Sequence, residues 1–420
     1  MLKTPTVPAW TRELKFRPLD RGSRASDHLD LLRGTAALAV LLGHLHNSFF
    51  VSFRKSGSRN PIAAGLIFLS SFSHEAVIIF FVLSGYLIGT SVLKAAVTQR
   101  WSWNGYVMRR ATRLYVVLLP ALLLTAVLDR LGLRLFGASG NIYGERKPGF
   151  TWAFASPNTT RLGTDVLVGN ILYLQTILVP SYGSNMALWS LSLEWWYYIL
   201  FPLAILTGKW ARSIGAILTT VAAYLAGLSF IGYFGIWLMG IALNTDLFVS
   251  MRWITRRRAL AIFVANLVFI RIFKMVVYHD EVPGISQGCL DFAVAVVTLI
   301  LIETMLRDRR VSAGSAYSWF ARQLSGMSYT LYAIHSPIEV FFCAMLVGSG
   351  ELWRPRLLTF SKAGAITLFT IAVAYVFARL FEDRTDIIRE GIIRLVGDRR
   401  VPLVSKSTIA KIGSTSKPPP

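Results

Sequence analysis

The stretch LDLLRGTAALAVLLGHLHNSFF, residues 29–50, decides the fold. It is apolar and about as long as a helix that crosses a bilayer, which needs roughly 20 residues. Yet it begins with Asp30 and Arg33 and carries His44 and His46 in its interior. Ionisable groups at membrane depth are costly and generally face a bundle interior or an aqueous cavity. The stretch is predicted to be a membrane helix whose histidines are either satisfied by neighbouring helices or part of a site.

The composition supports a membrane protein. Of 420 residues, 54% are hydrophobic and 16% are charged, whereas soluble domains carry about 25% charged residues. The net charge of +22 comes from basic residues in short segments between apolar runs. This pattern is the positive-inside bias of a multi-pass protein, so no nucleic-acid partner is expected. The cysteines, Cys289 and Cys343, lie in apolar stretches without Cys or His at ligand spacing, so neither a disulfide framework nor a metal site is expected.

The apolar runs predict an all-α, polytopic fold with about ten transmembrane helices. An eleventh run, 165–180, is short and contains Asn170 and Gln175. If it does not span, the strongly basic loop 252–258 and both tails fall on the cytoplasmic side, as the positive-inside bias requires. We therefore predict that both termini are cytoplasmic. The ten predicted spans are 30–50, 71–93, 114–133, 186–207, 213–229, 231–249, 259–277, 289–305, 328–347 and 363–381.

The predicted domain organisation is simple. Residues 1–29 form a basic cytoplasmic tail, residues 30–381 form one transmembrane domain, and residues 382–420 form a second basic, partly disordered cytoplasmic tail. The expected location is a membrane, with the lipid bilayer as the surrounding partner.

Helix geometry separates the two histidines of the first span. Arg33 and His44 are eleven residues apart, which places them within about 20° of one helix face and about 16 Å apart along the axis. His46 is rotated by about 200° from His44. The geometry therefore selects His44, near mid-membrane, below an arginine near the cytoplasmic surface.

Other ionisable residues recur where spans are predicted. Arg109 and Arg113 are one helical turn apart. They can either bind one anionic group together or be ordinary basic residues of a cytoplasmic loop. Glu194 lies well inside a span, where a carboxylate needs a donor. His335 lies about two turns into the ninth span, and a structural histidine is as well supported there as a functional one.

A pair of small residues interrupts another apolar helix. Ser84 and Gly85 lie in FFVLSGYLIG (80–89). Small residues allow either close helix packing or close approach of the backbone to a ligand.

Five stretches together resemble the acyltransferase-3 family of integral membrane O-acyltransferases. These stretches occur in the order typical of that family: LDLLRGTAALAVLLGHLH (29–46), FFVLSGYLIG (80–89), RRATRLY (109–115), LWSLSLEWWYYILFP (188–202) and SYTLYAIHSPI (328–338). Members of the family are described with ten membrane helices, which agrees with the number of spans predicted from charge.

The resemblance implies transfer of an acyl group, most commonly acetyl from acetyl-CoA, to a hydroxyl of a glycan such as an exopolysaccharide, O-antigen or lipo-oligosaccharide. It implies catalytic roles for His44, Glu194 and Asp30. The residues expected on the donor side are Arg33, Arg109, Arg113, Ser84, Gly85 and His335, and His335 is alternatively a second base. The resemblance also implies a bacterial inner (plasma) membrane as the location. His44 is expected either to act as a general base or to carry the acyl group, and Glu194 either to orient His44 or to bind the acceptor.

Two other classes of function fit fewer of these residues. A transporter could use the buried histidines and Glu194 as a proton relay, but no pair of broken helices recurs in two halves of the chain. A scaffold without catalytic activity leaves Arg33, His44 and Glu194 unexplained.

Overall fold

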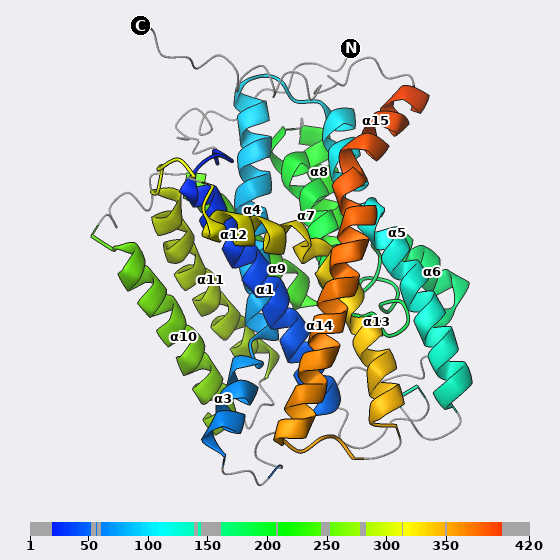
Figure 1. The fold of residues 1–420 in the computed structure, drawn as a ribbon. Helices are drawn as coiled ribbons and strands as arrows, with labels where there is room; N and C mark the ends of the chain where they lie inside the picture. The colour runs from blue at the N-terminus through cyan, green and yellow to red at the C-terminus, as the bar shows by residue number, and fades with distance from the viewer. Residues whose placement is uncertain are drawn as a thin grey trace, which may run out of the picture.

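Helices account for the regular secondary structure of the described residues (Figure 1). The computed structural model describes residues 19–51, 56, 60–137, 142–143, 161–206, 209–244, 253–277, 283–312, 314–348 and 351–396. Within these ranges the only β-type pairings are isolated bridges. The helices are α1 (Arg24–Phe49), α3 (Pro61–Leu69), α4 (Ser73–Val97), α5 (Trp103–Phe136), α6 (Thr164–Ile171), α7 (Trp189–Leu206), α8 (Lys209–Ala226), α9 (Leu228–Ile241), α10 (Arg256–Val277), α11 (Gly284–Leu306), α12 (Ala316–Gly326), α13 (Ser328–Leu346), α14 (Leu357–Leu380) and α15 (Thr385–Val396), with 3₁₀ turns η4 (Met186–Leu188), η5 (Ala242–Asn244) and η7 (Glu382–Arg384).

The helix α1 lies at the centre of the packing, in contact with α4, α12 and α13. Its first turn is capped by Ser23, whose side chain accepts a hydrogen bond from the backbone N–H of Ser26. Glycines let its neighbours approach closely: a Cβ on Gly34 would lie 2.5 Å from Leu324, and a Cβ on Gly43 would lie 2.5 Å from Ser73. In Figure 1, α12 runs across the bundle near the start of α1, while α10 and α11 flank one side and α5 and α6 the other.

The packing of α4 against α9 explains Gly85. A Cβ on Gly85 would lie 1.8 Å from the carbonyl oxygen of Trp237, and a Cβ on Gly240 would lie 2.2 Å from the carbonyl oxygen of Val82. Such close contact through small residues is common between membrane helices. Because α9 fills the space beside Gly85, close helix packing explains why a glycine is needed there. The alternative, a close approach of the backbone to a donor ligand, does not explain it.

Among the described residues, six helical segments are long and apolar enough to cross a membrane. Two shorter apolar helices lie at Ser213–Ala226 and Leu228–Asn244. The protein is therefore a polytopic helical membrane protein. Each of the ten predicted segments overlaps a helix in its described part. Four of these helices are not among the six: α8 and α9 are the shorter apolar helices, and α1 and α7 carry polar residues in their interiors. The ten-span count stays a prediction. The six are Pro61–Val97, Trp103–Phe136, Arg256–Val277, Ser286–Leu306, Ser328–Leu346 and Leu357–Leu395.

The run 165–180 does not form a long helix. The helix α6 has eight residues, or about 12 Å of rise, and turns follow it up to η4. Asn170 and Gln175 are fully buried and donate to the carbonyl oxygens of Pro180 and Leu188, both at 2.9 Å. Irregular backbone at membrane depth requires burial in protein of this kind. We call residues 164–188 the inserted segment.

The start of α1 and the end of α14, with α15 beyond it, lie at the same end of the bundle (Figure 1). We call this the arginine end, after Arg33, Arg113, Arg256 and Arg310. A helix occupies Thr385–Val396 in the predicted C-terminal tail. Residues 1–18 and 397–420 of the two predicted tails lie outside the described ranges.

Candidate active site

Two histidines from different helices face each other inside the bundle. His44 Nδ1 lies 3.2 Å from His335 Nε2, and the ring centroids are 4.9 Å apart. His335 is fully buried, and its Nδ1 lies 3.0 Å from the carbonyl oxygen of Leu331. Because a carbonyl only accepts, His335 Nδ1 carries the proton and His335 Nε2 accepts. His44 Nδ1 then donates, so the lone pair of the neutral His44 ring is on Nε2.

A proline in α13 creates the docking point for the inserted segment. Pro337 has no N–H, so the carbonyl oxygen of Ala333, four residues earlier, lacks its helical donor. Asn185 Nδ2 donates to that oxygen at 2.8 Å. The inserted segment is therefore bonded to α13 within one turn of His335.

Asp129 of α5 holds the inserted segment from the other side. This fully buried carboxylate accepts hydrogen bonds from the backbone N–H and the hydroxyl of Ser184, both at 2.6 Å, and from Tyr143 Oη at 3.1 Å. Ser336 Oγ of α13 donates to the carbonyl oxygen of Ser184 at 2.7 Å. Gly183 has φ +54°, and a Cβ there would lie 2.1 Å from Asp129 Oδ2. The turn at 183–184 thus joins α5 to α13 beside the histidine pair.

Arg33 and Asp30 lie together at the arginine end. Arg33 Nη2 donates to the carbonyl oxygen of Ser325 at 2.9 Å, and Ser325 Oγ donates to Asp30 Oδ1 at 2.6 Å. Arg113 of α5 is close enough to interact electrostatically with Arg33. Asp30 precedes His44 by 14 residues, or about 21 Å along the helix. The structure therefore places Asp30 beside Arg33 and α12 and away from His44, and its expected catalytic role stays a prediction.

The arginines of α5 divide into two environments. Arg109 and Arg113 are exposed, one turn apart, and they approach Arg389 and Arg33 respectively. Arg110 instead lies over the rings of Tyr106 and Tyr198, at 5.7 and 5.9 Å from their centroids. Sequence reasoning missed Arg110, although the adjacent tyrosines of α5 and α7 are the stacking partners an arginine favours.

Glu194 is held by Ser84 and Tyr198. Ser84 Oγ donates to Glu194 Oε1 at 2.6 Å, and Tyr198 Oη donates to the same oxygen at 2.5 Å. Trp237 Nε1 donates to Ser84 Oγ at 3.1 Å. The position beside His44 belongs to His335. The structure thus joins Ser84 to Glu194 in a second polar cluster, and the imidazole ring that orients His44 is His335.

Tyr332 connects this second cluster to the histidines. Its hydroxyl lies 2.6 Å from the hydroxyl of Ser190, and its ring centroid lies 6.0 Å from that of His335. Tyr332 is also near enough to Glu194 to interact electrostatically. The tyrosine lies within the stretch SYTLYAIHSPI, but only the packing of α7 on α13 shows that it faces both groups.

Glu339 is a further buried group that sequence reasoning missed. It lies one helical turn beyond His335 and is 1% exposed. One ring nitrogen of His44, one ring nitrogen of His335 and a carboxylate oxygen of Glu339 lie within 4.8 Å of one another. The i, i+4 spacing of His335 and Glu339 was the available signal.

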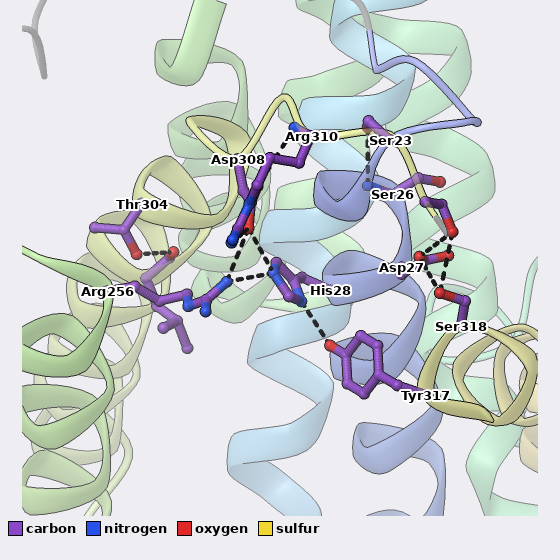
Figure 2. Close-up of polar contacts among 12 residues, drawn as sticks. Ser23, Ser26, Asp27, His28, Arg256, Thr304, Asp308, Arg310, Tyr317 and Ser318 are labelled. Atoms are coloured by element: carbon purple, nitrogen blue, oxygen red, sulfur yellow. Dashed lines mark hydrogen bonds and ion pairs between the residues drawn. The ribbon is translucent and has the colours of Figure 1, made fainter. Parts of the chain in front are cut away.

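A separate polar cluster fastens the start of α1 at the arginine end (Figure 2). His28 Nδ1 lies 2.5 Å from Tyr317 Oη, and Arg256 donates to His28 Nε2. Arg256 Nη1 and Arg310 Nη2 lie 3.1 and 2.6 Å from Asp308 Oδ2. Burial, with the Arg256 charge second, lowers the pKa of His28, while the hydrogen bonds from Arg310 hold the pKa of Asp308 well below its usual range. At neutral pH, therefore, the ring of His28 is neutral and Asp308 is ionised.

These features define a class: a polytopic helical membrane protein with a histidine pair inside the bundle, below an arginine-rich end. The acyltransferase-3 family model, described as an acyltransferase domain, matches residues 27–379. The chain belongs to the acyltransferase-3 family and is an acyltransferase that transfers groups other than amino-acyl groups.

Two curated relatives are similar over most of the chain. Acyltransferase MdmB of Streptomyces mycarofaciens is 26% identical over 405 residues, covering 88% of this chain and 92% of the relative. The O-acetyl transferase of Shigella phage Sf6 is 26% identical over 310 residues, covering 70% of this chain and 82% of the relative. No solved structure matches the chain.

Proposed function

We propose that the protein moves an acetyl group from cytoplasmic acetyl-CoA to a hydroxyl of a glycan on the non-cytoplasmic side of a bacterial plasma membrane. The observation that carries this proposal is the His44–His335 pair, in which the carbonyl oxygen of Leu331 determines the tautomer of both rings. A neutral His44 with its lone pair on Nε2 has the protonation state that a general base needs.

The donor enters at the arginine end. Coenzyme A is a polyanion, and arginines suit phosphate groups because their guanidinium donors bind in pairs. Arg33 and Arg113 lie close together there, with Arg109 one turn away from Arg113. His44 lies on the same helix as Arg33, about 16 Å deeper, a distance that the extended pantetheine arm can cover. Positive-inside bias makes the arginine end cytoplasmic.

The transfer then follows from the positions of the histidines. His44 Nε2 takes the proton of the acceptor hydroxyl while its oxygen attacks the thioester carbonyl. The bond from His44 Nδ1 to His335 Nε2 stabilises the imidazolium that forms, because a hydrogen bond from a charged donor is stronger than a neutral one. Breakdown of the tetrahedral intermediate expels the coenzyme A thiolate, which takes the proton from His44. In this sequence His44 acts as the base and carries no acyl group.

The cluster of Glu194, Ser84 and Tyr198 contacts Arg110 through Tyr198 and interacts electrostatically with Tyr332, the neighbour of His335. Arg110 stacks on Tyr198, so a cation borders the cluster without an ion pair to Glu194 in the described contacts. We assign this cluster to orienting the donor thioester or the acceptor sugar ring. Asp30 is assigned to positioning Arg33 through Ser325.

The phage relative is an O-acetyl transferase by name, which supports acetyl as the group and a hydroxyl as the acceptor. The test is mass analysis of surface glycans from cells with and without the gene. The proposal expects glycans that lose acetyl groups on deletion and regain them when the gene is returned. Glycans of identical mass in both strains, with the protein demonstrably present in the membrane, would contradict it.

A further inference from the structure

The carboxylate of Glu339 is buried without the partners such a group normally has. It is 1% exposed, and its Oε1 atom has no hydrogen-bond partner in the described part of the chain. Buried charges in proteins are paired or coordinate metals, because desolvating an unpaired charge is costly. An ionised Glu339 therefore requires a ligand that supplies positive charge.

The two histidine nitrogens near Glu339 have the spacing of zinc ligands. A tetrahedral ion with bonds of about 2.0–2.1 Å separates its ligand atoms by roughly 3.3–3.4 Å. His44 Nδ1 and His335 Nε2 are 3.2 Å apart. A Glu339 oxygen lies within 4.8 Å of a ring nitrogen of each histidine.

The surroundings of His335 also match those of metal-binding histidines. Such a ring usually donates its other nitrogen to a carboxylate or backbone carbonyl, as His335 Nδ1 does to Leu331. Two imidazoles and one carboxylate suit Zn²⁺ better than Mg²⁺ or Ca²⁺, which prefer oxygen ligands. His335 and Glu339 share a face of α13, so the helix itself presents two of the three ligands.

We propose that His44, His335 and Glu339 bind one Zn²⁺ ion and that this ion inhibits the transferase. To coordinate through Nδ1, His44 must give up the proton on that nitrogen and carry it on Nε2 instead. The lone pair that abstracts the acceptor proton is then lost. This regulatory role rests on the proposed function of His44, whereas binding of the ion does not.

Zinc binding is measured on the full-length, detergent-purified protein by equilibrium dialysis against ZnCl₂ and elemental analysis. We expect one Zn²⁺ per chain, with at least tenfold weaker binding in Glu339→Gln and in His335→Gln. His46→Gln is the matched control, since it removes a histidine from the same helix that stacks on Phe50, and it is expected to bind like wild type. Folded wild-type protein without bound zinc would overturn the proposal, as would equal binding by Glu339→Gln.

Inhibition is measured separately, as the rate of acetyl-CoA consumption against ZnCl₂ concentration with EDTA as the reversal. The half-inhibitory concentration is expected to match the dissociation constant from dialysis, and EDTA is expected to restore the rate. Zinc that binds at these residues without inhibiting would refute the regulatory role. A protein that binds zinc but transfers no acyl group would contradict the proposed function and leave the metal site standing, so the two failures are distinguishable.

Discussion

After His44 itself, His335 is the residue expected to affect the reaction rate most, because it forms a hydrogen bond with His44. His335 Nε2 accepts from His44 Nδ1 at 3.2 Å, deep inside the bundle. Hydrogen bonds to charged groups contribute about 1.5–3 kcal/mol. In the proposed mechanism His44 becomes charged only during the reaction, so this bond favours the transition state over the ground state.

His335→Leu is therefore expected to lower kcat by roughly tenfold to a hundredfold, with little change in KM for acetyl-CoA. His335→Gln keeps a side-chain carbonyl that can accept from His44, and it is expected to recover part of the loss. Steady-state kinetics on purified variants measure both parameters. Equal kcat values for the His335→Leu variant and the wild-type protein would show that the hydrogen bond between His44 and His335 does not assist the reaction.

For individual residues, the sequence predicted positions within one helix but did not predict which residues of different helices are in contact. The spacing of Arg33 and His44 could be computed from helix geometry alone. The partner of His44 could not, because His335 lies 291 residues away in the chain and periodicity does not say which helices touch. Arg110 and Glu339 were missed for the same reason, since their surroundings come from α7 and α1.

Among the structural elements, the inserted segment is the one whose shape is predicted least well from the apolar runs of the sequence. Charge favoured a run 165–180 that does not span, and the structure has only the eight-residue helix α6 and turns there; that the run does not cross the membrane stays a prediction. Its actual shape depends on Asp129, Ser184 and the carbonyl group freed by Pro337. These are tertiary hydrogen bonds with no local sequence pattern.

Asp129→Ala is expected to destabilise this segment by about 2–3 kcal/mol, because it leaves buried donors of Ser184 and Tyr143 unpaired. Thermal unfolding of the detergent-purified protein gives the global effect. Hydrogen exchange localises it, with faster exchange expected at residues 181–188. Asp165→Ala, an exposed carboxylate at the start of α6, is the control. Unchanged exchange at 181–188 in Asp129→Ala would show that Asp129 does not hold the turn.

The start of α1 is held by a cluster whose stability depends on pH. The pKa of His28 is lowered in the folded protein, so below its ordinary value near pH 6.5 the unfolded chain binds more protons than the folded one. Stability contributed by His28 is present above that pH and is lost as the pH falls. Asp308 stays ionised over the same range, because its pKa is depressed.

We expect the melting temperature to fall between pH 7.5 and pH 5.5, and the fall to be smaller in His28→Gln, which cannot take up the proton. Tyr317→Phe, which leaves the histidine in place, is expected to keep the pH dependence. A pH profile identical in His28→Gln and wild type would assign the effect to other groups.

For the whole molecule, the described ends of the transmembrane domain lie on one side. The start of α1 and the end of α14 share the arginine end (Figure 1), where Thr330 Oγ1 of α13 also donates to Glu382 at 2.7 Å. Composition and charge predicted an all-helical membrane protein and located ten helices. They could not show which helices are central, because all are apolar and the packing is decided by residues such as Gly34, Gly85 and Gly240.

Cysteine labelling tests the predicted topology. In a Cys289→Ser background, which removes the exposed native thiol, Arg309→Cys is expected to react with a membrane-impermeant reagent only in inverted vesicles. Glu351→Cys, in the exposed connection between α13 and α14, is expected to react in intact spheroplasts. Labelling of both positions from the same side would refute the arrangement, and labelling with the sides exchanged would reverse the direction of acyl transfer.

The most direct test of the central claim is the acetyl-transfer rate of purified His44→Ala, with His46→Ala as its matched control. General acid–base catalysis contributes about 10²–10⁴-fold, so we predict that His44→Ala loses at least a hundredfold in kcat while still binding acetyl-CoA. His46→Ala is predicted to keep most of its activity. A folded His44→Ala protein that transfers acetyl at the wild-type rate would contradict the account.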